Sequence, residues 1–329
     1  IGGDQRERIE RSLNVSNAGS SLLQTFINRT VQMLALREFG LQAVLPRRAG
    51  TGDAEYINRR TPNATGGEWL ADTGGVSVHS GAYAQTSFPY RTCVTRGKVT
   101  RKLQATGRTY ADILALEMGA KAEDFANALE AGFLNGDTSG NVTGVGANAN
   151  ICNGFLTLLQ GVNSFSTEQL VSNAGATTAN TALSLSKLDQ AIDLVKGSSQ
   201  RADLAIVGSF AGIRQVNSAL QAQQRFNDIT EIAGGFRVRT YDGIPLIVST
   251  AMLNNFEFET NGIIKGNAGL GTGLLVINTR YGYIGELTPT TVMPLAKTDS
   301  QFDEFDIFWD GAPVLSNTFG ASLLTNLSS

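Results

Sequence analysis

Residues that could do chemistry are few in this chain, and they lie apart from one another. His79 is the sole histidine and lies among glycines and serines, with no cysteine or acid cluster at ligand spacing. A metal site needs several ligands together and a general base needs partners, so we expect His79 to be solvated. Ser209 directly follows Gly208, whereas a nucleophile elbow places one residue between the glycine and the serine. We expect Ser209 to cap a helix instead.

The other candidate motifs for a bound group are equally weak. The glycine-rich stretch at residues 269–273 precedes a predicted strand, whereas phosphate binding needs a helix N-terminus there. Cys93 and Cys152 are the two cysteines, far apart in a long chain, which favours reduced thiols over a disulfide framework. The sequence therefore predicts no catalytic, cofactor-binding or metal site, and a protein that is not an enzyme.

Two charged clusters remain, one basic and one acidic. The basic cluster comprises Arg91, Arg96, Lys98, Arg101, Lys102 and Arg108. The acidic strip comprises Asp299, Asp303, Glu304, Asp306 and Asp310. Paired carboxylates could cleave glycosides and a basic patch could bind nucleic acid. Few aromatic residues accompany the basic cluster and the chain has a pI of about 5.4, so we expect subunit contacts, with the basic cluster against the acidic strip.

Length and charge distribution fit a protein that meets copies of itself. The 329 residues suffice for a sizeable core and two compact units. Residues 1–110 carry 15 basic and 8 acidic side chains, and the remainder carries 11 and 21. Such a division suits subunits that meet head to tail. No run of 18 apolar residues and no signal-peptide pattern is present, which predicts no membrane contact.

The pattern of apolar residues changes along the chain. Residues 1–20 are polar and predict an extended arm, and helical spacing follows from Ser21 to Gly40. Residues 50–108 are rich in Gly, Thr, Ser and Arg and cannot bury a core of their own, which favours a long two-stranded hairpin that reaches onto a neighbour. The clearest helix follows; Thr109 is its predicted cap.

The second half predicts a mixed region followed by strands. The long helix should end at Asn135-Gly136, with Gly136 in a left-handed cap. Residues 160–275 alternate between helix and strand patterns, with a hairpin turn at Asp242-Gly243. After residue 275 we expect short strands split by Gly, Pro and Asp. These strands are Leu274–Ile277, Tyr281–Leu287, Thr291–Leu295 and Phe305–Phe308.

Three segments, which in chain order are residues 68–72, 133–137 and 235–249, resemble segments of the HK97-type major capsid proteins of tailed bacteriophages. A long helix that runs into Phe133-Leu134-Asn135-Gly136-Asp137 resembles the end of the family's spine helix, although Val142 stands where proline is common. Glu68-Trp69-Leu70-Ala71-Asp72 is similar to the start of the family's extended E-loop. Gly235 to Ser249 resembles the hairpin of its A-domain.

This resemblance implies an α+β class and a division of the chain. The HK97-like fold would comprise an N-arm with a short helix (1–48), an extended E-loop hairpin (49–108), the P-domain spine helix and following turn (109–158), an α/β A-domain (159–275) and closing strands that return to the P-domain (276–329).

The resemblance also implies function and partners. The chain would be a major capsid protein that self-assembles into hexamers and pentamers of an icosahedral head, enclosing double-stranded DNA without sequence specificity. Portal, scaffolding and decoration proteins are further expected partners, and the expected location is the virion, assembled in the host bacterial cytoplasm. The candidate inter-subunit contacts are Arg91, Arg96, Lys98, Arg101, Lys102, Trp69, Asp303, Glu304 and Asp306. An encapsulin-type nanocompartment shell is the alternative, and a secreted adhesin or enzyme domain is less favoured.

Overall fold

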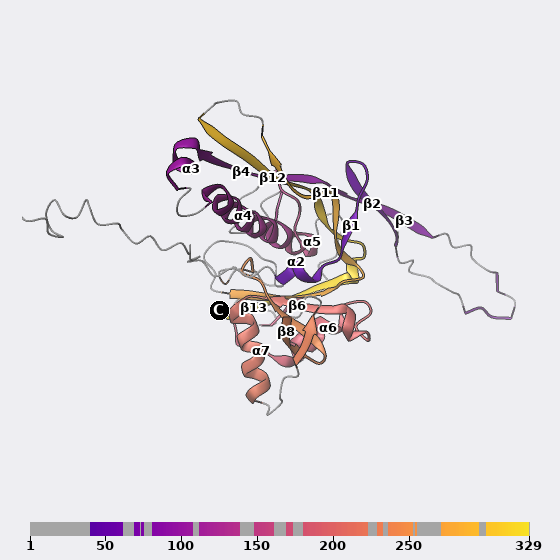
Figure 1. The fold of residues 1–329 in the computed structure, drawn as a ribbon. Helices are drawn as coiled ribbons and strands as arrows, with labels where there is room; N and C mark the ends of the chain where they lie inside the picture. The colour runs from indigo at the N-terminus through magenta and orange to yellow at the C-terminus, as the bar shows by residue number, and fades with distance from the viewer. Residues whose placement is uncertain are drawn as a thin grey trace, which may run out of the picture.

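The protein consists of two β-sheets, a separate two-stranded hairpin and helices that include one long rod (Figure 1). The computed structural model describes residues 40–61, 69–72, 74–75, 81–107, 112–138, 148–160, 169–173, 180–222, 229–232, 236–252, 254, 271–295 and 301–328. Residues 1–39, which hold most of the expected N-arm and all but the last residue of its helix, lie outside the described residues, as do His79 and residues 139–147 after the long helix.

A four-stranded sheet carries the long helix on one face. Its order is β1 (Arg47–Ala49), β11 (Gly282–Pro294), β12 (Phe302–Leu315) and β4 (Arg91–Thr100). The β1–β11 pair is parallel and the other two pairs are antiparallel. The helices beside it are α3 (Arg101–Gly107), α4 (Ile113–Asn135) and α5 (Phe155–Leu159). Helix α4 packs against β4 and β12, so residues from three distant parts of the sequence form this layer.

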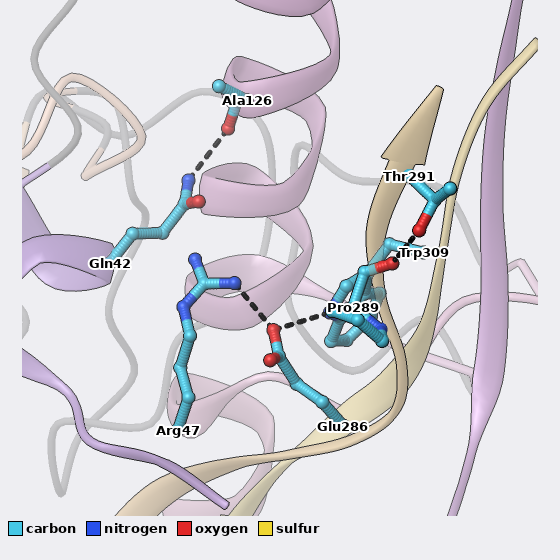
Figure 2. Close-up of polar contacts among 7 residues, drawn as sticks. All are labelled: Gln42, Arg47, Ala126, Glu286, Pro289, Thr291 and Trp309. Atoms are coloured by element: carbon cyan, nitrogen blue, oxygen red, sulfur yellow. Dashed lines mark hydrogen bonds and ion pairs between the residues drawn. The ribbon is translucent and has the colours of Figure 1, made fainter. Parts of the chain in front are cut away.

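The prediction of several short strands after residue 280 was wrong, because they merge into two long ones. Strand β11 continues from Gly282 to Pro294 through shifts of register on both sides of Thr288. Pro289 lies within this irregular stretch. Proline has no amide hydrogen, and at a bulge no hydrogen bond between strands is lost for that reason. Its carbonyl accepts a hydrogen bond from the Thr291 hydroxyl at 2.9 Å (Figure 2). A bulge therefore replaces the breaks that the sequence pattern predicted.

A seven-stranded mixed sheet forms the centre of the second half. Its order is β5 (Leu170–Ser172), β13 (Ala321–Ser328), β10 (Gly271–Asn278), β6 (Leu204–Gly208), β9 (Ile244–Val248), β8 (Phe236–Tyr241) and β7 (Ile229–Ile232). Two helices, α6 (Leu185–Asp193) and α7 (Phe210–Ala222), pack on it. The short helix α2 (Gly40–Val44) and the 3-10 turns η4 (Arg201–Asp203) and η5 (Thr318–Gly320) complete the described elements.

Both faces of this sheet are buried, and they belong to two different cores. Leu275 and Ile277 of β10 pack in the core that contains α4 and α5, whereas Leu274 and Val276 pack with α6 and α7. Successive strand side chains point to opposite faces. The alternation therefore explains why all four residues 274–277 of β10 are apolar, and the sheet is the middle layer of the molecule.

The closing strands are divided between the two sheets. Strand β13 pairs with β10 and β5 in the seven-stranded sheet, while β11 and β12 pair in the four-stranded sheet. The expected boundary between residues 275 and 276 falls within β10. The last strand is buried on both faces, which only a covered sheet provides. The division into domains stays a prediction.

The long helix α4 ends at Asn135-Gly136 as predicted, but its start and the conformation of its C-terminal cap differ from the prediction. It begins at Ile113, where the Asp112 carboxylate accepts a hydrogen bond from the Ala115 amide at 3.2 Å, so the cap is Asp112 and not Thr109. Gly136 follows the helix with φ −54°, so the predicted left-handed cap was wrong. A Cβ there would lie 2.2 Å from the Cys152 carbonyl oxygen. Glycine is needed for close approach of two backbone segments.

Several other sequence-based predictions are confirmed. The Ser209 hydroxyl accepts a hydrogen bond from the Gly212 amide at 3.1 Å and caps α7. Asp242 and Gly243 both have positive φ, 51° and 78°, and connect β8 to β9 in a tight hairpin turn. The buried strand expected at residues 204–207 is β6.

The core under α4 is centred on one tryptophan. The rings of Phe133 and Trp309 lie 5.1 Å apart in an edge-to-face arrangement, and both side chains are fully buried. The Trp309 indole donates to Glu286 Oε1 at 2.8 Å, and the same oxygen pairs with Arg47 at 2.5 Å (Figure 2). Burial of the ring therefore leaves no unsatisfied indole donor.

We predict that Trp309→Ala lowers the free energy of unfolding of the isolated subunit by about 3–5 kcal/mol, the usual cost of a large core cavity. The matched control is Trp69→Ala, because the Trp69 side chain is fully exposed, and its expected change is within about 0.5 kcal/mol. Urea denaturation followed by circular dichroism measures both. Equal losses in the two variants would contradict the assignment of Trp309 to the core.

A second buried polar group, Glu130 of α4, ties three segments together. Its carboxylate accepts hydrogen bonds from the Leu41 amide at 2.9 Å, the Gln42 amide at 3.1 Å and the Ser249 hydroxyl at 2.7 Å. The Gln42 side chain also donates to the Ala126 carbonyl at 2.8 Å (Figure 2). The carboxylate thus caps α2 and fixes it and the end of β9 to the long helix.

Burial raises the pKa of Glu130, although the hydrogen bonds that it accepts oppose this effect. Because the folded-state pKa is raised, the contribution of the group to stability is fully present below the unfolded value of about 4.3. It declines as the pH rises through the folded-state pKa.

We predict that Glu130→Gln lowers the free energy of unfolding by about 1–3 kcal/mol. The NH2 group of the glutamine cannot accept a hydrogen bond, so at least one of the three donors that now bind Glu130 loses its acceptor. The advantage of the unmodified protein over this variant should be largest below about pH 4.3 and shrink at higher pH. Denaturant unfolding across pH measures both effects. Glu123→Gln on the same helix is the control, and a pH dependence of equal size there would refute the assignment.

Candidate subunit-contact site

The basic cluster and the acidic strip meet within one chain. Strands β4 and β12 are antiparallel, and their register places Arg96 opposite Asp306 and Lys98 opposite Glu304. Arg96 donates two hydrogen bonds to the Asp306 carboxylate at 2.7 and 2.8 Å, and Lys98 Nζ lies 2.9 Å from Glu304 Oε1. The spacing of two in both strands places all four side chains on one face.

These two ion pairs lie at the surface, and one of them alters the pKa of an acidic partner. The hydrogen bonds from the Arg96 guanidinium hold the pKa of Asp306 below its usual value. Four of the nine candidate contact residues therefore balance one another within the chain. The sequence analysis expected the basic cluster to meet the acidic strip, but between subunits and not within one chain. Their role between subunits stays a prediction.

The remaining candidates are placed at two ends of the molecule. Arg101 and Lys102 begin α3, are exposed, and have no ion pair within the part of the chain that the structure describes. Arg91 lies opposite Gly311 in the β4–β12 ladder, and Asp303 lies opposite Val99. Trp69 lies in the segment between strands β2 (Ala54–Thr61) and β3 (Ala82–Pro89) and is fully exposed. Contact of these residues with a neighbour also stays a prediction.

The expected two-stranded hairpin is confirmed for residues 54–61 and 82–89. Strands β2 (Ala54–Thr61) and β3 (Ala82–Pro89) pair with each other in a sheet of their own. Figure 1 shows this hairpin leaving the body at the end opposite α3. Eight residues per strand rise roughly 26 Å. Tyr56 and Tyr83 on the hairpin are exposed, whereas Phe88 of β3 is buried in the core of the body. The two tyrosines therefore lack cover within the described part of their own chain.

A polar cluster that the sequence did not reveal fixes the base of the hairpin. The Glu55 carboxylate of β2 accepts hydrogen bonds from the Tyr90 hydroxyl at 2.7 Å and the Tyr283 hydroxyl at 3.1 Å. The Arg48 guanidinium lies 4.0 Å from the centre of the Tyr283 ring. These residues are up to 235 positions apart, and no local motif connects them.

The cluster shifts the ionisation of both tyrosines. Burial, together with the Glu55 carboxylate, raises the pKa of Tyr90 and raises the pKa of Tyr283 to about 12. Both phenols therefore stay neutral, and remain hydrogen-bond donors to Glu55, at alkaline pH above the ordinary tyrosine pKa of about 10.

The described residues offer no group of three or more metal-ligating side chains. Among the helices that the structure describes, none is both long and apolar enough to cross a membrane.

Comparison with known proteins decides the family. The family model of the SU10 major capsid protein matches residues 95–328, well over half of the chain. The chain belongs to the SU10 major capsid protein family. This confirms the identification as a major capsid protein, a structural subunit and not an enzyme. As a capsid protein it assembles with copies of itself and is a component of the virion.

Solved structures show the fold of this capsid protein. The holo-SrpI encapsulin complex from Synechococcus elongatus PCC 7942 has 13% identity and a TM-score of 0.64, over 94% of this chain and 95% of that one. The capsid of a native GTA particle has 16% identity and a TM-score of 0.63, over 96% and 100%. The capsid of Myoviridae phage XM1 has 13% identity and a TM-score of 0.58, over 92% and 97%.

At these identities the similarities establish architecture, and they confirm the α+β, HK97-like fold. No curated protein matches the chain. The resemblance drawn from the spine helix, the E-loop segment and the A-domain hairpin is thus confirmed for this capsid protein as a whole.

We predict that Glu55→Gln lowers the pKa of Tyr283 from about 12 toward the ordinary value of about 10. Because that pKa is raised in the folded state, stability from this group is present below about pH 10 and is lost as the pH rises toward 12. Tyrosinate absorbance during an alkaline titration measures the shift, and Tyr283→Phe identifies the step. An unchanged step in the Glu55 variant would exclude the carboxylate as its cause.

Proposed function

We propose that this capsid protein forms hexamers and pentamers that tile an icosahedral phage head around double-stranded DNA. In this arrangement each E-loop hairpin lies over a neighbouring subunit. The observation that carries the proposal is the hairpin itself, which leaves the body and presents Tyr56, Trp69 and Tyr83 to solvent. Apolar side chains gathered on one element indicate a surface that is covered in an assembly.

Rigid attachment of the hairpin supports the same proposal. Glu55 and its two tyrosine donors hold the base, so the direction of the hairpin is set before a neighbour arrives. Preorganisation reduces the entropy lost on contact. In a closed shell each subunit makes several such contacts. A subunit already held at one edge meets its next partner at high effective concentration, so the assembly is more stable than any one contact.

The charge of the chain supports weak contact with DNA and no sequence readout. The net charge is −3, and Arg96 and Lys98 of the basic cluster are already paired with acids of the same chain. Sequence-specific binding needs a basic surface with base-reading side chains. Portal, scaffolding and decoration proteins complete the proposed set of partners, and assembly takes place in the host bacterial cytoplasm.

An encapsulin-type shell, which encloses protein instead of a genome, is the second candidate. The observation in its favour is the similarity to the encapsulin from Synechococcus elongatus, at a TM-score of 0.64. The capsid neighbours have similar scores, so the fold does not separate the two functions. The family match favours the phage head.

Cryo-electron microscopy of the native assembly tests this proposal. We expect a closed icosahedral shell with hexamers, pentamers and layered density of packed DNA, and nuclease-protected DNA in the purified particle. A shell filled with protein and free of DNA would establish the encapsulin function. A monomer or small oligomer in native material would overturn the shell.

A further inference from the structure

An apolar groove lies between the long helix and the far end of the β11–β12 pair. It has a volume of about 480 Å³, within the range of roughly 300–1,000 Å³ typical of pockets for drug-sized ligands. Six of its eight lining residues are apolar: Leu114 and Met118 from α4, with Val292, Pro294, Leu295 and Phe305. Asp303 and Glu304 complete the lining.

The floor of the groove is built rigidly. The Phe305 ring lies over Gly97 of β4, where an added Cβ would come within 2.1 Å of the ring. Glu304 is neutralised by Lys98 at 2.9 Å. The groove therefore presents fixed apolar walls, and Met118 adds a flexible side chain that adapts to an aromatic ring.

An exposed side chain of matching chemistry lies in the segment between the two hairpin strands. Trp69 is fully exposed, and Leu70 beside it is half exposed. A turn closed by the Gly74 amide and the Ala71 carbonyl at 2.9 Å follows them. The turn holds this pair at the end of the hairpin, where a Trp side chain exposed to water gains most from burial in a pocket.

We propose that Trp69 of one subunit binds in the groove of a second copy of this chain. The groove is lined by the start of α4. Figure 1 shows α3 and the start of α4 at the opposite end of the body from the β2–β3 hairpin, so one subunit cannot fill its own groove. A contact between two different surfaces is heterologous, and it closes into a ring when repeated by rotation. The inference rests on the proposed overlap of each hairpin with a neighbour and names the site that receives it.

Charge supports the same partner. Asp72 follows Trp69 in the turn and is exposed, without an ion pair among the described residues. Beside the groove, the Arg101 amide donates to the Gln301 carbonyl at 2.8 Å, which fixes the start of α3 next to the start of β12. Arg101 and Lys102, which have no ion pair among the described residues, thus lie next to the start of β12, the strand that carries Asp303. An acidic turn that enters there meets complementary charge, which fixes orientation more than affinity.

Cross-linking in assembled particles tests the proposal. The variant Trp69→Cys with Leu114→Cys is assembled and treated with a short bismaleimide linker, and denaturing electrophoresis reads the products. We expect a ladder of covalent oligomers that ends at the ring size. Two controls are Trp69→Cys alone, which measures background from Cys93 and Cys152, and Trp69→Cys with Ser199→Cys, an exposed residue after α6. Both should remain monomeric.

A fluorescence measurement covers the case in which the cysteine variant fails to assemble. Trp69 and Trp309 are the two tryptophans, so the difference spectrum between the unmodified protein and Trp69→Phe reports on Trp69. We expect its emission to move to shorter wavelength and its quenching by acrylamide to fall on assembly.

The outcomes separate the two proposals. Shells of unmodified protein with no ladder above the controls, or with Trp69 still open to quencher, would overturn docking in the groove and leave the shell intact. Failure of the unmodified protein to form any shell in native material would overturn the proposed function itself. A ladder equal in the Ser199 control would show non-specific collision and also reject the groove.

Discussion

The buried carboxylate of Glu130 is the contact on which the arrangement of the two layers depends. It joins the helix that follows the N-terminal segment, the long helix α4 and the end of β9, which are distant in sequence. A buried carboxylate costs several kcal/mol unless donors surround it, and here three donors do so. The position of each segment is therefore specified by the others, because movement of any one leaves a buried polar group unpaired.

A rigid body and a projecting hairpin follow from this arrangement. The seven-stranded sheet is buried on both faces, with the α4 core on one side and the α6–α7 core on the other. The hairpin is attached at its base by the Glu55 cluster and by Phe88, which is buried in the α4 core, and it has no core of its own. Stability is thus concentrated in the body, and the element free to contact a neighbour is the one that contributes least to folding.

The sequence predicted the elements whose signals are local. The Ser209 cap, the Asp242-Gly243 turn and the β6 strand depend on residues within a few positions. It misjudged features that depend on distant contacts. Gly136 reads as a left-handed cap but is required by the Cys152 backbone, and Pro289 reads as a strand end but lies in a bulge. The Glu55 cluster had no local signal in the sequence. Contact between the basic cluster and the acidic strip was predicted, but the sequence did not show that the β4–β12 register pairs Arg96 with Asp306 in the same chain.

The position of β4 at the edge of its sheet has a consequence for subunits crowded together before assembly. An open edge strand invites another strand to add, which leads to aggregation. Arg96 and Lys98 place charge along this edge, and Thr92 and Thr100 lie in the same strand. A second β4 that paired here would have to desolvate these charged side chains, which are exposed beside their paired acids. Growth by sheet extension is thereby discouraged, and free subunits are kept for the ordered pathway that builds a closed particle.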